Sequence, residues 1–480
     1  MSSISVPLLK HHDTQETFTR TTNGARATLP VPNSTRSFWL YGTPDANPLA
    51  REGSTGDLPS DVDICIIGSG ITGVSAAYHL AKLFDGHKDI DKPLKAVILE
   101  ARDFCSGATG RNGGHLSPTR FLDFARLEAT YGTDEAKRQH ALEKHTAQSL
   151  IDIIKNGGLE NTVDYVPVDH VAIFLAEQEI EEARADYSTA EAADLDLSGI
   201  EWLNKDAMQA EYGTSFAGLR YGGANLWPLK LVSELYKLAS TQNPSKFELA
   251  LHTNTPVTAV GPGSSPERRW KVSTPRGNIS CSYVLHATNA YASYLLPHMH
   301  GPDGIVPARG QVVALRANAT PTKTSWWGNQ GFEYWFPRPV EDTEKYPLVI
   351  LGGGREVAGQ NFGYYTTDDS VINPEVGKAL RNFLPGIIPG KYEKGREPEM
   401  EWAGIMGFTK LGDPFVGPVI DKSRPEELQG QYISAGYSGI GMTRAYACAE
   451  VIAGMVFADI TKTSWTKPDW LPRHYLTAER

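Results

Sequence analysis

The chain has 480 residues, more than one hydrophobic core usually supports, so we expect about two domains of ~200 residues each. Its composition, 40% hydrophobic and 21% charged, is that of a soluble globular protein, and no apolar run approaches the ~20 residues of a membrane span. The net charge of −10 disfavours nucleic acid and anionic membranes as partners.

The N-terminal segment, residues 1–35, is rich in Thr, Ser, Asn and Pro and predicts a flexible arm without the apolar core of a secretory signal. The aromatic cluster at residues 37–41 is expected to pack on the body. The four cysteines lie far apart without metal-type spacing. We therefore expect no metal site and an intracellular, cytoplasmic location.

A strand, a glycine turn and a helix follow. Residues 63–67 form an apolar run typical of a buried parallel strand, residues 71–84 predict a helix with one apolar face, and residues 95–99 predict a second buried strand. The turn matches G-x-G-x-x-G, whose glycines allow a tight bend, a close approach to a pyrophosphate and packing of helix on strand. Its members are Gly68, Ser69, Gly70, Ile71, Thr72 and Gly73.

The second strand ends in Glu100, which is placed to accept both ribose hydroxyls of a dinucleotide and so disfavours a 2′-phosphate. At this point either NAD or FAD fits. A second small-residue loop follows directly, and a flavin protein needs such a loop because its backbone must pass a second diphosphate face and then the ring. The candidate cofactor residues here are Ala101, Arg102, Ser106, Gly107, Ala108, Thr109, Arg111, Asn112, Gly113, Gly114 and His115.

The remaining elements alternate in type. Residues 122–155 predict helices, and residues 255–260 and 283–287 predict buried strands. Residues 305–355 alternate densely in aromatics and predict an antiparallel sheet. A last glycine-rich loop at 436–443 leads into a helix ending near residue 457, so its amides could point at the pyrimidine edge of a flavin.

These motifs together resemble the D-amino-acid oxidase superfamily of flavoenzymes, and within it the γ-glutamylputrescine oxidase-like branch. The matching segments are 106–115, 257–260, 286–290, 309–311, 336–338, 351–354, 402–409 and 436–443. The resemblance implies an α/β fold: an FAD-binding Rossmann-like domain of the glutathione-reductase type and a mixed, mainly antiparallel substrate domain. The expected boundaries are 36–120, 215–304 and 400–460 for the FAD-binding domain, 121–214 and 305–399 for the substrate domain, and 461–480 for a C-terminal tail.

The resemblance also implies further FAD-binding residues. They are Val257, Ala287, Thr288, Gly436, Tyr437, Ser438, Gly439, Ile440, Gly441, Met442 and Thr443. Related oxidases tether the flavin through a cysteine near the Met406 stretch, where this chain has none, so FAD is expected to be non-covalent. Cys105 is left as the other candidate for a tether.

The reaction implied is oxidation of a C–N bond in an amine or an N-substituted amino compound. A hydride passes from the substrate to flavin N5 and leaves an imine, which water hydrolyses to an aldehyde or keto product plus amine or ammonia. The reduced flavin is then reoxidised by O2, which is reduced to H2O2. Three alternatives stay open: a dehydrogenase that uses another acceptor, a flavin monooxygenase, for which a second dinucleotide signature is missing, and a non-enzymatic FAD-binding protein.

The substrate residues show one departure from the family. Amino-acid oxidases of this superfamily bind the substrate carboxylate with an Arg in Gly-x-Arg-Pro, and Met406 stands in its place here. A thioether does not pair with a carboxylate, so a free α-amino acid bound in the usual way is disfavoured.

Other residues are expected to build the substrate site. Arg309 or Arg338 could bind a substrate carboxylate in place of the missing arginine, and a structural role is the alternative for each. Gln311 and Trp335 are further substrate-binding candidates beside Met406. A cluster of aromatic residues at 326–336 could desolvate the amine, which lowers its pKa. The candidate catalytic residues are His115, Tyr334 and Lys323, the last near the place of an oxygen-activating lysine in related oxidases.

Overall fold

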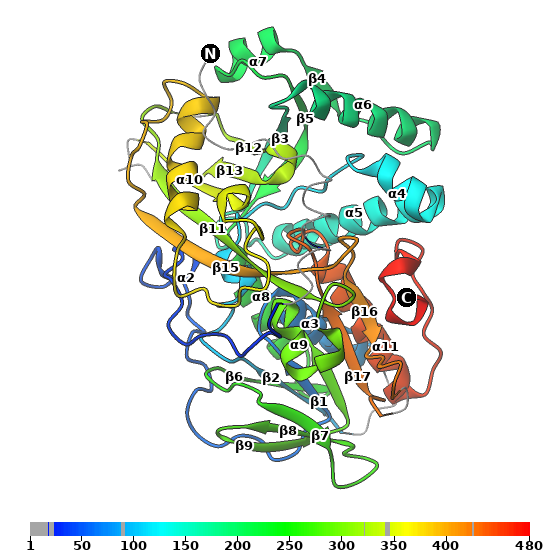
Figure 1. The fold of residues 1–480 in the computed structure, drawn as a ribbon. Helices are drawn as coiled ribbons and strands as arrows, with labels where there is room; N and C mark the ends of the chain where they lie inside the picture. The colour runs from blue at the N-terminus through cyan, green and yellow to red at the C-terminus, as the bar shows by residue number, and fades with distance from the viewer. Residues whose placement is uncertain (1–17, 19–23, 88–91, 321, 341–345, 425–426) are drawn as a thin grey trace.

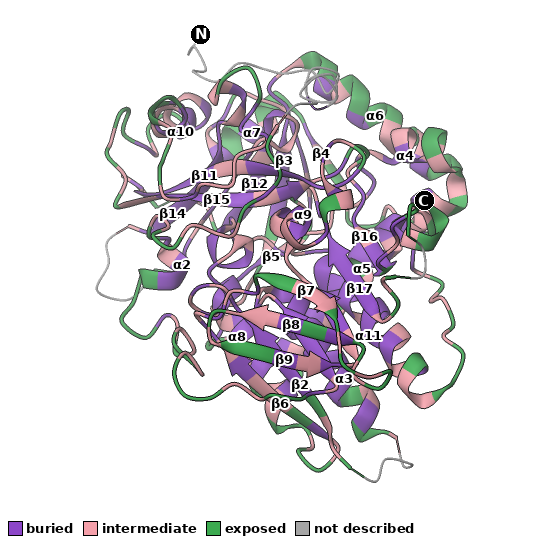
Figure 2. Cartoon of the chain, turned by 60° about the horizontal axis from the view of Figure 1, so that its bottom comes forward, coloured by how far each residue is buried: buried purple, intermediate pink, exposed green. Residues whose placement is uncertain are grey.

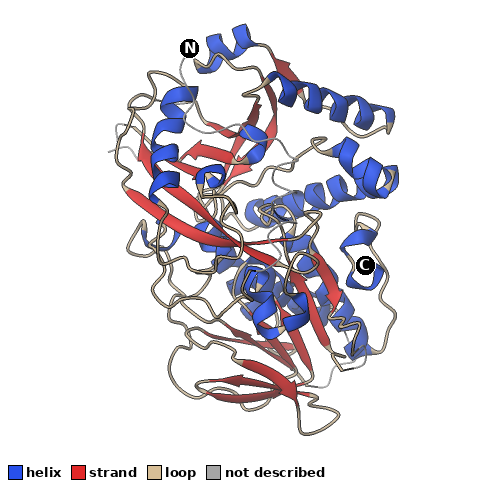
Figure 3. Ribbon diagram, viewed as in Figure 1, coloured by secondary structure: helices blue, strands red, loops and turns tan. Residues whose placement is uncertain are grey.

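A computed structural model describes residue 18 and residues 24–87, 92–320, 322–340, 346–424 and 427–480 of the protein. Its secondary structure is organised around two large β-sheets, one in the lower and one in the upper half of Figure 1. Figure 3 shows the strands of both sheets running through the middle of the molecule with helices on their outer sides. The described residues contain no helix long and apolar enough to cross a membrane.

The first sheet has six strands in the order β16-β17-β10-β1-β2-β6, and all of them are parallel except the antiparallel edge strand β16. Its strands are β1 (Ile64–Ile67), β2 (Leu94–Leu99), β6 (Phe247–His252), β10 (Tyr283–His286), β16 (Phe415–Pro418) and β17 (Gln431–Ala435). The helices associated with it are α3 (Ile71–Asp85), α8 (Pro228–Thr241) and α11 (Ala445–Thr461), and α3 contacts both of the others. Strands covered by helices in this way read as continuous apolar runs, and β17 is purple along its length in Figure 2 because all five of its residues are buried.

A small three-stranded sheet lies beside this domain. It consists of β7 (Ala259–Pro262), β8 (Trp270–Thr274) and β9 (Gly277–Cys281). The prediction of a buried strand at 255–260 was wrong, because the strand begins only at Ala259 and its residues are exposed or half-buried. Residues 255–258 instead form a loop that buries Val257, and the Thr255 N–H donates to the carbonyl of Glu100, just after β2, at 2.7 Å.

The second sheet has eight strands in the order β15-β11-β14-β13-β12-β3-β5-β4, antiparallel except for the β12–β3 pair. Its strands are β3 (Val166–Ile173), β4 (Glu201–Leu203), β5 (Gly218–Asn225), β11 (Val306–Arg316), β12 (Thr324–Gly328), β13 (Glu333–Pro337), β14 (Leu348–Gly353) and β15 (Met400–Phe408). The mixed, mainly antiparallel substrate domain predicted from the sequence is therefore confirmed.

Helices cover both faces of the eight-stranded sheet. On one face α7 (Lys205–Tyr212) and α10 (Pro374–Ile387) complete an apolar cluster with the strands, and on the other α4 (Phe124–Tyr131) and α6 (Glu177–Ala192) do so. The long helix α5 (Thr133–Asn156) contacts α11 of the first domain as well as α4. Two short helices, α2 (Phe38–Tyr41) and α9 (Ala292–Leu295), lie in the connections.

The expected domain boundaries differ from the sheets in two places. β5 and β15 lie in the segments expected for the FAD-binding domain, yet both pair within the eight-stranded sheet. β15 pairs with β11 over nine residues, and this long-range pairing has no local sequence signal. As a consequence, residues 400–408 carry the substrate sheet to the edge of the cofactor site.

The expected N-terminal arm is in part attached to the body. Residues 1–17 and 19–23 lie outside the described part of the chain. Within residues 24–35, Ala27 is buried and its N–H donates to Ser293, while Thr35 donates its N–H to the Asp369 carbonyl at 2.8 Å. This part of the segment therefore follows the surface of the protein as an extended strap, which we call the N-terminal strap (residues 24–35).

Candidate active site

A cavity of about 610 Å³ is lined by residues from both large sheets. We call its lining residues the cavity wall. They come mainly from segments 67–72, 99–102, 107–115, 287–291, 310–312, 330–334, 404–413 and 437–445. Most of the predicted cofactor residues are in this wall, so segments far apart in the sequence converge on one space.

The first glycine turn has the geometry expected of a phosphate-binding turn. Gly68 has φ +109°, and a Cβ on Gly73 would lie 2.0 Å from the Gly68 carbonyl oxygen, so neither position tolerates a side chain. The helix α3 starts after Gly70 without a side-chain cap. Gly70, Ile71 and Thr72 line the cavity, so the positive end of the helix dipole lies at the cavity as anion binding requires, although the Ile71 N–H itself donates to the Thr109 hydroxyl at 3.1 Å.

Glu100 lies in the wall at the end of β2. Its Oε2 accepts hydrogen bonds from the N–H and hydroxyl of Ser69 at 3.0 and 2.8 Å, and its Oε1 accepts one from the Arg102 N–H at 3.0 Å. These contacts orient the carboxylate, and Oε1, which accepts only one of them, keeps a lone pair for a further donor.

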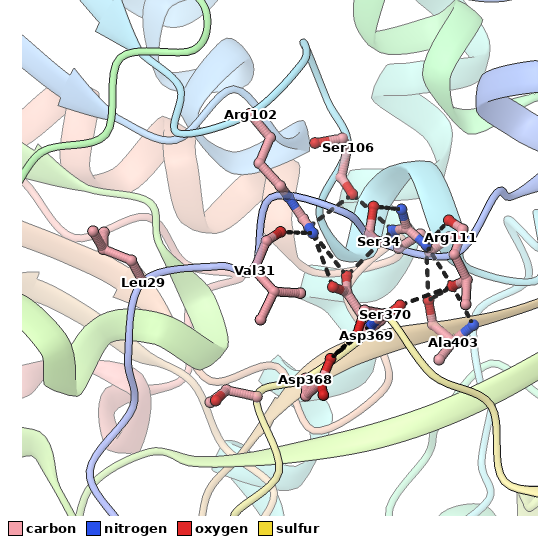
Figure 4. Close-up of polar contacts among 12 residues, drawn as sticks. Leu29, Val31, Ser34, Arg102, Ser106, Arg111, Asp368, Asp369, Ser370 and Ala403 are labelled. Atoms are coloured by element: carbon pink, nitrogen blue, oxygen red, sulfur yellow. Dashed lines mark hydrogen bonds and ion pairs between the residues drawn. The ribbon is translucent and has the colours of Figure 1, made fainter.

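Two wall arginines share one buried acid (Figure 4). Arg102 Nη1 donates to both carboxylate oxygens of Asp369 at 2.9 and 3.1 Å, and Arg111 Nε lies 3.5 Å from the same carboxylate. Both also bind the N-terminal strap, Arg102 through the Val31 carbonyl and Arg111 through the Ser34 hydroxyl. Two guanidiniums against one carboxylate leave an excess positive charge, which suits a diphosphate.

The C-terminal glycine loop closes the site from the other side. Ser438 has φ +52° and donates its N–H to the Gly407 carbonyl at 2.8 Å, so the loop is tied to β15. The Tyr437 hydroxyl lies 3.0 Å from the Thr72 hydroxyl and thereby joins this loop to α3. Residues 437–443 are all in the wall.

Four predicted cofactor residues support the wall rather than line it. Ser69 orients Glu100, Gly73 allows α3 to pack on β1, and the Ser106 carbonyl accepts from Arg102 and Arg111. Gly436, with φ +88°, donates its N–H to the Asn289 side chain at 2.9 Å. Each of the four stabilises or permits the conformation of a segment that lines the cavity.

Unpaired polar atoms show that the wall fits a large polar cofactor. Within the described residues, the hydroxyls of Thr288 and Thr443 and the Nε of Arg102 are buried without a hydrogen-bond partner, although all three residues line the cavity. Buried polar groups are normally satisfied, so a ligand with several acceptors is expected there. All four cysteines are buried, and none of the described wall residues is a cysteine, which agrees with non-covalent binding.

The end of the cavity beside the loop 113–115 carries the candidate catalytic residues. The His115 ring lies 5.8 Å from the rings of both Tyr334 and His170. Burial lowers the pKa of His115 to about 4, and burial raises the pKa of Tyr334 to about 12. Both side chains are therefore neutral at physiological pH.

Four predicted residues do not reach the cavity. Lys323 is exposed one residue before β12 and lies outside the wall, so its assignment as an oxygen-activating lysine was wrong. Arg309 donates to the Asp368 carbonyl at 3.3 Å outside the wall.

The other two are core residues. Arg338 is buried against Asp164 and three aromatic rings, so it is structural. Trp335 is fully buried and stacks on Trp326 at 5.4 Å, on the opposite face of β13 from Tyr334. Strand alternation explains this outcome, because neighbouring residues of a strand face opposite sides.

Met406 and Gln311 do lie in the wall. Gln311 is held there by Glu401, to which its amide donates at 2.6 Å, and by Asn373, whose N–H it accepts at 2.8 Å. From the aromatic set, Trp327, Phe332 and Tyr334 line the cavity, whereas Trp326, Trp335 and Phe336 do not. Trp327 and Tyr334 are register partners of the β12–β13 pair, which explains why they share a face.

Sequence reasoning missed many of the wall residues, among them His170, Tyr221 and Arg355. His170 and Tyr221 are also register partners, on β3 and β5. Arg355 follows the glycine run at the end of β14. The matched motif 351–354 pointed to that run, but no pattern in the sequence says where the next side chain points.

Comparison with known proteins identifies the family. The model of the DAO family, described as FAD dependent oxidoreductase, matches residues 63–455. Gamma-glutamylputrescine oxidoreductase of Escherichia coli (strain K12) is 26% identical over 414 residues, covering 83% of this chain and 84% of that protein. Glycine oxidase of Bacillus licheniformis is 23% identical over 414 residues, covering 84% and 95%.

Solved structures agree on the fold. L-amino acid deaminase from Proteus vulgaris, with its specific insertion deleted, matches with a TM-score of 0.63 at 17% identity over 91% of this chain and 98% of that one. Glycine oxidase from Geobacillus kaustophilus matches with a TM-score of 0.61 at 17% identity over 85% and 99%. Since the family match spans most of the chain and the cavity wall fits the cofactor, this protein belongs to the DAO family of FAD-dependent oxidoreductases, and FAD is its cofactor.

Proposed function

We propose that this enzyme oxidises a C–N bond of a small amine or amino compound at the end of the cavity formed by His115, Tyr334 and Met406. The observation that carries the proposal is the position of Tyr334 against the loop 113–115, because a Cβ on Gly113 would lie 2.4 Å from the Tyr334 ring. Names of similar proteins, gamma-glutamylputrescine oxidoreductase and glycine oxidase among them, support the substrate class.

The chain contributes position and environment. FAD, when bound, supplies the hydride acceptor. Trp327, Phe332 and Tyr334 form an aromatic surface that excludes water, and desolvation favours the neutral amine, whose lone pair is needed for oxidation. His115 is neutral, and its Nε2 has no hydrogen-bond partner among the described residues, which supports a role in exchanging one hydrogen bond with a bound substrate.

The electron acceptor is a separate proposal. We take O2 as the acceptor and H2O2 as the product, with electron transfer to another acceptor as the competing possibility. Because Lys323 is exposed and outside the cavity wall, any oxygen-activating positive charge would have to come from a charged side chain of the wall itself. Stopped-flow reoxidation decides between the two: reduced enzyme that reoxidises in air within seconds is an oxidase, and reoxidation over many minutes indicates a dehydrogenase.

Anaerobic titration tests the function. Loaded enzyme is mixed with a panel of amines, N-alkyl amino acids and α-amino acids while flavin absorbance is followed. We expect bleaching by at least one compound class, with a stoichiometric imine-derived carbonyl product. If no member of a broad panel bleaches the flavin, while dithionite does, C–N oxidation is contradicted and a binding role is favoured.

A further inference from the structure

Arg355 is held in the cavity wall by its backbone. It is the first residue of a short turn (Arg355–Val357) that follows β14, and the preceding Gly354 has φ +70°. The Gly354 N–H donates to Oε1 of the buried Glu333 at 2.8 Å. The direction in which the Arg355 side chain leaves the sheet is therefore set by a left-handed glycine and a buried hydrogen bond.

The guanidinium of Arg355 is packed between aromatic rings. It lies 4.4 Å from the ring centroid of Phe408, 5.1 Å from that of Tyr364 and 5.9 Å from that of Phe332. Its Nε donates to the Phe362 carbonyl at 3.2 Å. Three rings and one carbonyl orient the group, but none of them carries a negative charge.

The far end of this guanidinium is unsatisfied. Nη2 is buried and has no hydrogen-bond partner within the described part of the chain, and no described carboxylate forms an ion pair with Arg355. The other wall arginines differ in this respect. Arg102 and Arg111 share Asp369, Arg126 pairs with Asp123, and Arg444 pairs with Glu143.

The adjacent acid neutralises Arg355 only in part. Glu356 lies outside the cavity wall, and its Oε1 accepts from the Asn329 amide, which also donates to Glu333. Burial raises the pKa of Glu356 to about 7 although the charge of Arg355 acts to lower it, so near neutrality its carboxyl is only partly ionised. A guanidinium that is buried at one end and lacks an anion is costly unless a ligand supplies one.

The position of this cation compensates for Met406. Phe408, which the guanidinium covers, follows Met406 by two residues on β15, so both side chains face the cavity about 6.6 Å apart along the strand. The family's carboxylate-binding arginine would stand at Met406. Arg355, in the turn after β14, supplies a positive charge beside Phe408, which is two residues along β15 from Met406.

We propose that Arg355 binds a carboxylate of the substrate. The substrate is then an amine that also carries a carboxylate, bound with that group on the guanidinium of Arg355 and its C–N bond toward Tyr334 and His115. This assignment rests on the proposed function, and it names the substrate class for the same site. An unsubstituted diamine offers no partner to Arg355 and is expected to be a poor substrate.

The test combines substitution with paired substrates. Arg355→Met removes the charge and keeps the length, Arg355→Lys keeps the charge, and Arg396→Met is the matched control, since that arginine lies on the surface 3.6 Å from Glu393. Each variant is assayed with pairs of amines that differ only in a carboxylate against its amide. A second measurement titrates acetate, propionate and benzoate into the oxidised enzyme and follows the flavin spectrum.

Losing a charge-assisted hydrogen bond is expected to raise KM for the carboxylate substrates and Kd for the carboxylate ligands roughly 10- to 100-fold in Arg355→Met. The amide substrates should change less than about threefold, kcat should fall less than KM rises, and Arg355→Lys should recover part of the loss. Arg396→Met should match the wild type in both measurements.

Other outcomes separate the two proposals. If the wild type oxidises amide and carboxylate members of a pair equally well, or if Arg355→Met leaves the carboxylate Kd unchanged, the carboxylate assignment is wrong while C–N oxidation stands. If no amine reduces the flavin but carboxylates still bind through Arg355, the proposed function fails and the anion site remains. The wild-type comparison decides even if Arg355→Met does not fold.

Discussion

At the scale of single residues, the reactive end of the cavity is an arrangement of neutral groups. His115 titrates near pH 4 and Tyr334 near pH 12, both because burial disfavours their charged forms. Burial likewise lowers the pKa of His170 well below its ordinary value. From about pH 6 to 10 these three side chains keep one protonation state, so a change of rate in that window belongs to another group.

We therefore expect kcat to rise with pH through an apparent pKa below that of the free amine, which is about 10.4 for a lysine-like amine. The amine must be deprotonated to react, and kcat reports the bound substrate, whose cationic form the aromatic wall disfavours. The measurement is kcat from pH 6 to 10 for the wild type and for His115→Gln. Both should show the same limb, and a flat wild-type profile with a primary amine would contradict the explanation.

At the scale of elements, a buried acid pair joins β13 to the turn that carries Arg355. Glu333 is fully buried in β13, and Asn329 bridges it to Glu356. Burial and mutual repulsion raise the pKa of Glu333 well above its ordinary value, and burial raises that of Glu356 to about 7. At a pH between their ordinary and their raised pKa, these carboxyls are protonated in the folded protein and ionised in the unfolded chain.

This pair predicts stability that falls as pH rises. The folded protein binds more protons than the unfolded chain between about pH 4.5 and 7, so the free energy of unfolding decreases across that window, by on the order of 1–3 kcal/mol for Glu356. Glu356→Gln removes the titration and keeps an acceptor for Asn329, so its stability should vary less with pH.

Urea unfolding midpoints of the FAD-loaded protein at pH 5, 6, 7 and 8 measure this effect. The exposed Glu181→Gln serves as the control and should keep the wild-type slope. Equal slopes for the wild type and Glu356→Gln would show that Glu356 is already ionised in the fold at pH 5.

At the scale of the whole molecule, one buried acid connects the cofactor loop, the N-terminal strap and the loop before α10. Asp369 is 1% exposed, its carboxylate pairs with Arg102 and Arg111, and its carbonyl accepts from Thr35. Those arginines also reach the cavity, where FAD brings two phosphate charges. Binding of FAD and attachment of the strap are therefore expected to stabilise each other.

Asp369→Asn should show this coupling. Two buried guanidiniums lose their carboxylate, which is expected to destabilise the FAD-free protein by about 3–5 kcal/mol, and FAD should recover part of the loss because its diphosphate supplies the anion. Chemical unfolding with and without FAD measures both values. Asp368→Asn is the control: the half-buried Asp368 carboxylate accepts from the N–H and hydroxyl of Ser370 and makes no ion pair with the wall arginines in the described part of the chain, so the change should cost about 1 kcal/mol or less. An equal loss with and without FAD would contradict the coupling.

Much of the cofactor site was predictable from the sequence. The turn at Gly68–Gly73 and the small-residue loops at 106–115 and 436–443 were expected to bind through backbone groups of a contiguous segment, and Glu100 through a carboxylate directly after β2. Each of these signals is local in the sequence, and all four segments contribute residues to the cavity wall. The apolar runs of β1, β2 and β10 were equally clear, because strands covered on both faces must be apolar throughout.

The substrate end was decided by the tertiary structure. Arg309, Arg338 and Arg355 are alike in the sequence, and only the fold shows that Arg338 pairs with Asp164, that Arg309 turns away, and that Arg355 lines the cavity without an ion-pair partner among the described residues. The partner that neutralises a buried charge lies far along the chain, 174 positions away for Arg338. The sequence by itself therefore determined that this protein binds FAD and which local segments lie around the cavity. Which side chains face the substrate depended on strand register and long-range ion pairing, which exist only after the chain has folded.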